Sequence, residues 1–242
     1  MMREGLFQIA ANTALRPDVF RLRLTGDVSA CQTPGQFAAL KLEGQFLRRP
    51  FSVCDVDGES LTLVYQVKGR GTQALSQMRG GTLDVLTGLG KGFAVDKAGA
   101  SPLLIAGGLG FTPLYWLAKT LPVRPTVLLG FGRGEDILYE NEFRALGCEV
   151  LVCTEDGSRG FPGRVTEAMA GLTPSFFYAC GPEGMLKAVE RTAPCDGQLS
   201  LEARMGCGFG ACMGCGRETV NGVRRVCRDG PVFQKGEIVW GD

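Results

Sequence analysis

The stretch LLIAGGLGFTPLYWLAK, residues 103–119, decides the fold of this 242-residue chain. An uncharged apolar run ends in a cluster of glycines, and a helical pattern with Pro113 in its first turn follows at once. Such a turn lets a phosphate group approach backbone N–H groups at the positive end of the helix. The turn is not a GxGxxG fingerprint, so by itself it is also compatible with a plain tight connection.

The same pattern recurs three times toward the C-terminus. Apolar runs at residues 126–132, 148–157 and 175–181 are each followed by an amphipathic helical pattern. Strands alternating with helices indicate a parallel sheet that is covered by helices on both faces. The last unit contains a second glycine loop, FYACGPEGML, at residues 177–186. We expect both glycine loops at the edge of the sheet where parallel strands end and ligands bind.

The first 96 residues follow a different pattern. Short β-rich runs at residues 19–26, 37–44, 60–67 and 81–88 are separated by Gly, Pro and Asp turns, which predicts an antiparallel β-barrel. Within it, RRPFS places Arg49 beside Ser52, and VKGRGT ends in Gly71 and Thr72. An arginine can neutralise a phosphate, while glycine amides and a Thr hydroxyl can hold its oxygens. From composition alone, this segment could equally be a surface hairpin.

Four of the ten cysteines lie close together near the C-terminus, in MGCGFGACMGCGRETVNGVRRVC. The spacing of Cys207, Cys212 and Cys215 is that of plant-type [2Fe-2S] proteins, and Cys227 is the fourth thiol. Glycines between them let the backbone curl and point amides at the sulfur atoms. A structural zinc site is the alternative, but it normally brings two closely spaced Cys pairs, and only one is present. The other six cysteines, at positions 31, 54, 148, 153, 180 and 195, are expected to be small buried hydrophobes.

Composition narrows the function classes. Lys and Arg number 26 against 25 Asp and Glu, so a large basic face for nucleic acid is not expected. Histidine is absent, which removes the commonest general acid or base, so the chemistry should rest on cofactors. The start shows no signal-peptide pattern, and the uncharged stretch 101–118 is broken by glycines and Pro113, so we expect a cytoplasmic chain that does not enter a membrane.

Taken in order, RRPFS, the GT turn, TGLGKGF, GGLGFTP, TEDGSRGFPGRVT, CGPEGM and the four-cysteine tail resemble the ferredoxin reductase superfamily. The chain is most similar to the electron-transfer subunits of bacterial type B dihydroorotate dehydrogenases, from about residue 5 to the terminal GPVFQKGEIVW. The resemblance implies an FAD-binding antiparallel β-barrel at residues 1–97 and an NAD-binding α/β parallel-sheet domain at 98–196. A small [2Fe-2S] module would occupy residues 197–242.

The resemblance also implies residues for each cofactor. Cys180 would lie near the nicotinamide and the flavin. Cys207, Cys212, Cys215 and Cys227 would be the iron ligands. The residues implied for FAD are Arg49, Pro50, Phe51, Ser52, Val64, Tyr65, Gln66, Gly71 and Thr72. Those implied for NAD are Gly107, Gly108, Gly110, Thr112, Pro113, Asp156, Cys180, Gly181 and Pro182.

The function implied by the resemblance is electron relay in pyrimidine biosynthesis. Electrons would pass from the FMN of a partner dihydroorotate dehydrogenase subunit through [2Fe-2S] and FAD to NAD⁺, in a heterotetramer with two copies of each subunit. This chain is too short for a further (β/α)₈ barrel, so dihydroorotate itself would be oxidised on the partner.

Two alternatives stay open. One is the small subunit of a related NAD(P)H:ferredoxin or sulfhydrogenase-type complex. In the ferredoxin:NADP transhydrogenase type we expect a carboxylate among the cluster ligands, whereas all four positions here are Cys. The other is a zinc-stabilised binding module without redox activity. No residue can be placed confidently at the ribose 2′ position, so the sequence does not separate NAD from NADP.

Overall fold

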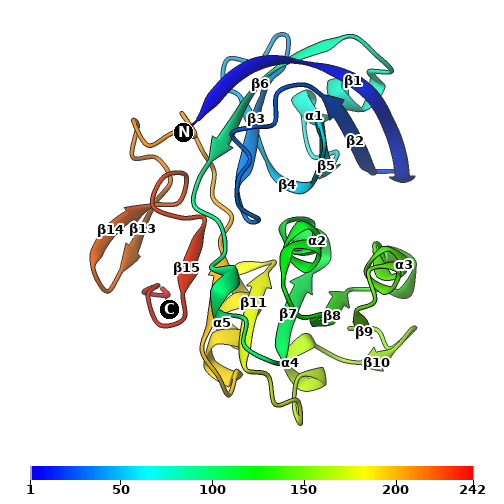
Figure 1. Cartoon of the computed structure of the whole chain (residues 1–242), viewed down its shortest axis with the longest axis vertical. Coiled ribbons are helices and arrows are strands. Elements are labelled where there is room, and N and C mark those ends of the chain that lie inside the picture. Colours follow the sequence, from blue (N-terminus) through cyan, green and yellow to red (C-terminus); the bar gives the residue numbers. More distant parts are fainter. Residues whose placement is uncertain (1, 242) are drawn as a thin grey trace.

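A computed structural model describes residues 2–241, and its first half is a closed six-stranded antiparallel barrel in the order β1-β2-β5-β4-β3-β6 (Figure 1). The strands are β1 Arg3–Arg16, β2 Val19–Thr25, β3 Phe37–Lys41, β4 Arg49–Asp57, β5 Ser60–Gln66 and β6 Thr82–Leu89. Alternate residues point inward, so that Leu22, Leu24, Leu61 and Leu63 are fully buried. The helix α1, Arg70–Gln77, contributes Leu75 to the same core. The predicted barrel is therefore confirmed.

The second half is a seven-stranded sheet in the order β10-β9-β8-β7-β11-β12-β15, parallel except for β15. Its strands are β7 Pro102–Gly107, β8 Thr126–Phe131, β9 Glu149–Thr154, β10 Phe161–Pro162, β11 Phe176–Cys180, β12 Gly197–Ser200 and β15 Val232–Gln234. Its helices are α2 Phe111–Thr120, α3 Glu140–Ala145, α4 Val165–Ala168 and α5 Glu183–Thr192. The predicted parallel sheet is confirmed.

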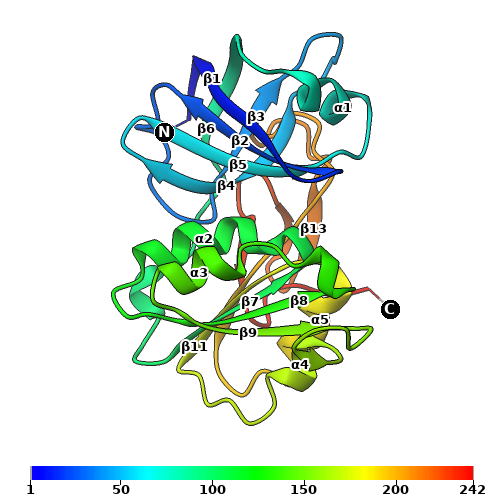
Figure 2. The ribbon, with the colours of Figure 1, turned by 90° about the vertical axis from the view of Figure 1, so that its right-hand side faces the viewer.

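Helices cover both faces of this sheet (Figure 2). On β7, Leu104 packs on the face covered by α2 and α3, while Ile105 packs on the face covered by α4 and α5. Every residue of β7 is buried, which explains why its sequence is a continuous apolar run and does not alternate.

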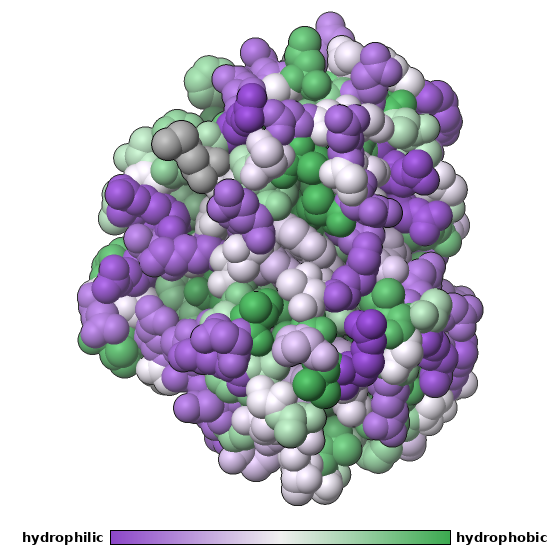
Figure 3. Space-filling model, in the orientation of Figure 1, coloured by the Kyte–Doolittle hydropathy of each residue, from purple (hydrophilic) through white to green (hydrophobic). Residues whose placement is uncertain are grey.

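Helix α2 lies between the sheet and the barrel (Figures 1 and 2). Its apolar side joins barrel residues such as Cys54 and Val64 in one core, and Lys119 bridges both carboxylate oxygens of Asp55 at 2.8 and 2.9 Å. White and green residues gather where the two halves meet on the face shown in Figure 3, within a largely purple surround. The seam between the two halves is therefore packed in part by apolar side chains.

The cysteine-rich segment leaves the sheet after β12 and returns to it as β15. It contains one hairpin, β13 Gly216–Thr219 with β14 Gly222–Arg225, and lies beside both the barrel and the sheet (Figure 1). The boundary that we expect at residue 196 falls just before β12, which pairs with β11 inside the sheet. No helix within residues 2–241 is long and apolar enough to cross a membrane.

Candidate redox centre

A cavity of about 250 Å³ opens where the barrel, the sheet and the cysteine-rich segment meet. Six of the nine residues expected to bind FAD line it, from β4 and β5: Pro50, Phe51, Ser52, Val64, Tyr65 and Gln66. The opposite wall comes from the sheet, with Thr112 at the start of α2 and Cys180 at the end of β11. The cavity therefore has the position that a flavin ring needs if it is to meet a nucleotide bound on the sheet.

The other three residues expected to bind FAD lie together beside this cavity. A Cβ atom added to Gly71 would stand 3.4 Å from Nε of Arg49, so the RPFS strand and the GT turn meet in space. The Thr72 hydroxyl accepts hydrogen bonds from the backbone amides of Lys68 (2.9 Å) and Gly69 (3.2 Å), which shapes the turn at the start of α1. An arginine beside a helix N-terminus is suited to bind a diphosphate.

The two glycine loops pack against each other. Gly181, with φ +158°, lies so close to Gly107 that an added Cβ would stand 3.0 Å from the Gly107 backbone. Gly110 is closer still to Cys180, where the carbonyl oxygen would be 2.0 Å from an added Cβ. The predicted neighbourhood of these loops at the carboxyl edge of the sheet is present in the structure.

A larger cavity, of about 540 Å³, lies at that edge. Gly107, Gly108 and Pro182 line it, as expected for nucleotide binding. Gly110 and Gly181 shape the loops but do not line this cavity. Pro113 is buried within α2, and Thr112 lines the flavin cavity instead. Asp156 does not line the cavity, because its carboxylate accepts hydrogen bonds from the Ser158 amide and hydroxyl.

Glu155 lines the nucleotide cavity in the place where Asp156 is expected. Sequence reasoning missed it, although TEDG offers two adjacent acids just after a strand. It also missed Arg164 and Met185 on the same cavity, and Phe37, Glu202 and Met205 on the flavin cavity. Several of these six residues lie within the quoted motifs, but no residue pattern shows which side chains of a motif enter a cavity, because that depends on the fold.

Cys180 is a buried thiol between the two cavities. Burial raises its pKa to about 12, and the charge of Glu202 acts in the same direction. The thiol is therefore neutral at physiological pH, which disfavours a role as a nucleophile. Five of the six scattered cysteines are buried as expected, and Cys195 is half-buried.

The four clustered cysteines form two pairs. Cys207 Sγ accepts hydrogen bonds from the amides of Ala211 (3.2 Å) and Cys212 (3.4 Å), and Cys212 Sγ accepts one from the Cys207 amide (3.4 Å). In the second pair, Cys215 Sγ accepts a hydrogen bond from the Cys227 amide at 3.4 Å. Within residues 2–241, no three metal-binding side chains surround one point. Two sulfur pairs suit two irons, whereas zinc needs four ligands around a single centre.

Backbone geometry favours sulfur anions in this loop. Gly208 (φ +78°) and Gly210 (φ +93°) curl the chain so that successive amides face the first pair. Although burial opposes ionisation, hydrogen bonds from the amides of Cys212, Phe209 and Ala211 lower the pKa of Cys207 to about 6. Cys207 is therefore suited to bind iron as a thiolate, whereas burial and the neighbouring Cys215 raise the pKa of Cys227 to about 12.

The whole arrangement is similar to that of a solved chain of the NADH-dependent reduced ferredoxin-NADP oxidoreductase, with a TM-score of 0.88 and 29% identity. The match covers 98% of this chain and 90% of the other. The fold alone is shared with a ferredoxin NADP⁺ reductase from Neisseria gonorrhoeae, at a TM-score of 0.67 and 18% identity over 78% of this chain and 89% of the other. Barrel, sheet and cysteine module together define an iron–sulfur flavoprotein of the ferredoxin reductase fold.

Sequence comparison narrows that class. Residues 104–191 match the oxidoreductase NAD-binding domain, and residues 202–239 match the iron-sulfur cluster binding domain of dihydroorotate dehydrogenase B. The chain is 42% identical to the dihydroorotate dehydrogenase B (NAD⁺) electron transfer subunit of Geobacillus sp. strain WCH70, over 99% of this chain and all of the relative. It is 40% identical to that of Lysinibacillus sphaericus strain C3-41, over 98% and 99%. The chain belongs to the family of dihydroorotate dehydrogenase B (NAD⁺) electron transfer subunits.

Proposed function

We infer that this chain relays electrons to NAD⁺ as the electron-transfer subunit of a dihydroorotate dehydrogenase complex. The observation that carries the inference is the order of the three sites. The Cys180–Pro182 loop borders both the nucleotide and the flavin cavities, and the segment from Leu201 to Met205 joins the flavin cavity to Cys207. Three cofactor sites in contact form a continuous electron path.

The chain's own residues divide the work. Arg49 and the turn at Gly71 and Thr72 hold the diphosphate of FAD, while the lining residues of β4 and β5 orient its ring. The glycine loops hold the nicotinamide nucleotide, and the neutral Cys180 thiol keeps water from the point of contact. When bound, FAD supplies the means to exchange an electron pair with NAD⁺ and single electrons with the cluster.

Glu155 gives a reason for NAD⁺ to be the preferred nucleotide. A carboxylate at the end of a sheet strand can accept a hydrogen bond from the ribose 2′-hydroxyl, and it repels a 2′-phosphate. We propose that Glu155 has this role, in place of the Asp156 expected from sequence.

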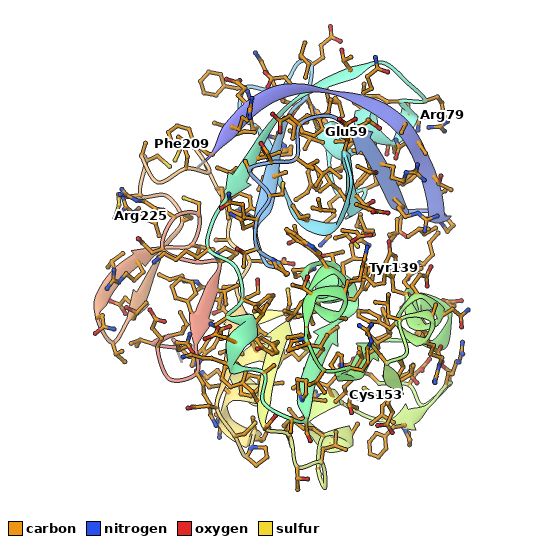
Figure 4. The ribbon with its side chains drawn as sticks, in the orientation of Figure 1. Glu59, Arg79, Tyr139, Cys153, Phe209 and Arg225 are labelled. Atoms are coloured by element: carbon orange, nitrogen blue, oxygen red, sulfur yellow. The ribbon has the colours of Figure 1, made fainter. Side chains whose placement is uncertain are left out.

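The partner docks on the cluster module. Phe209 (46% exposed) and Met213 (51% exposed) flank Cys212, which is itself exposed. Phe209 lies on the outer side of the module, away from the sheet (Figure 4). Exposed apolar side chains around an exposed ligand suit a surface that is covered by an FMN-bearing catalytic subunit. We propose two copies of each subunit, with dihydroorotate oxidised on the partner. We also propose that the chain lies in the cytoplasm, where cysteines stay reduced without disulfides.

A spectrum of the purified chain tests the relay. Under anaerobic conditions, flavin bands and a broad cluster envelope should both bleach on titration with NADH, at about two irons per FAD. A colourless zinc protein, or flavin without iron, would overturn the relay. Co-purification with an FMN subunit tests the partner, and light scattering of the purified complex tests its stoichiometry. Capture of a ferredoxin-linked subunit instead would support the related complex.

A further inference from the structure

A single aromatic ring separates the flavin cavity from the cluster loop. Phe37, on β3, lines the cavity and is only 4% exposed. On its other side, Cε2 lies 4.0 Å from the position of a Cβ atom at Gly208, the residue next to Cys207. A Cβ at Gly90 would stand 3.0 Å from Cε1, so the ring is held against that backbone too. Phe37 therefore borders the space for the flavin and lies near Gly208, the neighbour of a proposed iron ligand.

A second residue reaches the same ligand along the chain. Met205 lines the flavin cavity and precedes Cys207 by two residues. Two residues span at most about 7 Å, so the wall of the cavity runs directly into the ligand. Gly206, between them, lies close to Cys212, with an added Cβ 3.1 Å from its sulfur. Cys207 therefore follows Met205, which lines the flavin cavity, by two residues and is followed by Gly208, which lies near Phe37.

The other three cysteines of the cluster differ in burial. Cys215 and Cys227 are buried, and Cys212 is exposed beside Phe209 and Met213. Resting on the electron-relay function above, we propose that Phe37 and Met205 are positioning residues that set electron transfer between FAD and the cluster, with Cys207 as the flavin-facing ligand. The Cys212 side is then free to face the partner.

The physical reason lies in packing. Electrons cross filled protein more readily than an empty gap, and a close-packed ring leaves no gap. With FAD and the cluster bound, a hydride from NADH would bring two electrons to the flavin. The [2Fe-2S] cluster would accept one of them through this contact as one ferric iron becomes ferrous, and the other electron would stay on the flavin. A void at Phe37 or Met205 should therefore slow these crossings more than it slows hydride transfer to the flavin.

The test uses holoprotein variants mixed rapidly with NADH under anaerobic conditions. In Phe37→Ala, cluster bleaching should slow about tenfold relative to flavin bleaching in the same variant, which corresponds to a rise of about 1.4 kcal/mol in the barrier. Phe37→Met keeps the volume filled and should stay within about twofold of wild type. The EPR spectrum of the reduced cluster and the reduction potentials should be unchanged in both variants.

Leu89→Ala is the matched control. Leu89 is 3% exposed and pairs with Phe37 across β3 and β6, but it does not line the flavin cavity. Leu89→Ala creates a void in the same core. Equal slowing of cluster bleaching in Leu89→Ala would therefore overturn the proposal, and so would a wild-type rate of cluster bleaching in Phe37→Ala.

If Phe37→Ala fails to retain FAD or iron, Met205→Ala, which removes fewer atoms, replaces it in the experiment. It should slow cluster bleaching at least about threefold, and a wild-type rate would overturn the proposal. Wild-type protein without flavin or iron would refute the relay itself, which separates that failure from failure of this inference.

Discussion

Gly110 and Cys180 are in backbone contact: no side chain fits between them, since a Cβ at Gly110 would lie 2.0 Å from the Cys180 carbonyl oxygen. The contact joins the two loops that border the nucleotide and flavin cavities, so the distance from nicotinamide to flavin depends on it.

Replacing Gly110 with alanine should separate these loops. We expect NADH to reduce the flavin at least about tenfold more slowly, and the free energy of unfolding to fall by about 1–3 kcal/mol, as in overpacked cores. Stopped-flow absorbance and urea unfolding measure the two effects. Gly80→Ala is the control, because nothing lies within 4 Å of a Cβ there; similar losses in both variants would contradict the prediction.

Glu155→Gln should raise the KM for NADH about tenfold while kcat changes little. A hydrogen bond to a charged group contributes about 1.5–3 kcal/mol, and this one forms in the ground state as well as the transition state. Discrimination against NADPH should fall in the same variant. Asp156→Asn is the matched comparison, since Asp156 is bonded to Ser158; a larger effect there would restore Asp156 as the ribose-binding acid.

The free energy of unfolding should fall at alkaline pH because of Cys54 on the barrel. This residue is wholly buried and lies near Tyr139, which is labelled in Figure 4. Burial raises the pKa of this thiol from 9.0 to about 12. Between pH 9 and 12, the folded protein keeps the thiol proton that the unfolded chain loses. The thiol's contribution to the free energy of unfolding is therefore fully present below pH 9 and is lost as pH rises toward 12. At pH 10.5 the loss is about 2 kcal/mol. Urea unfolding at pH 8 and 10.5 should show a flatter dependence in Cys54→Ala than in Cys195→Ala; equal slopes would refute this assignment.

Loss of the cluster should loosen the module only. Cys215→Ser removes a buried ligand, and the segment around it is too small to build an apolar core of its own. We expect iron to be lost, proteolysis within residues 202–230, and FAD to be retained. Mass spectrometry of limited digests and a flavin assay test this, with Cys195→Ser as an iron-retaining control. Intact residues 202–230 in iron-free protein would count against the prediction.

Periodicity and glycine placement were enough to predict the barrel, the parallel sheet and the two facing loops, because those features follow from local residue patterns. The cysteine spacing predicts four iron ligands, and the structure places these four cysteines in two pairs. Glu155 could not be chosen over Asp156, since the choice depends on which carboxylate the Ser158 turn engages. Phe37 and Met205 carry no motif, and they reach the flavin cavity only through tertiary packing. The return of the chain as β15 was also missed, because three residues are too few for a periodic signal.

That return strand has a consequence for how iron is loaded. Pairing of β12 with β15 holds the two ends of the 31-residue segment 201–231 together. The loss of chain entropy on bringing those ends together therefore occurs when the sheet forms, before the cluster is assembled. Cluster assembly then has to order only the interior of a tethered loop, so iron can be lost and replaced while the nucleotide-binding sheet stays folded.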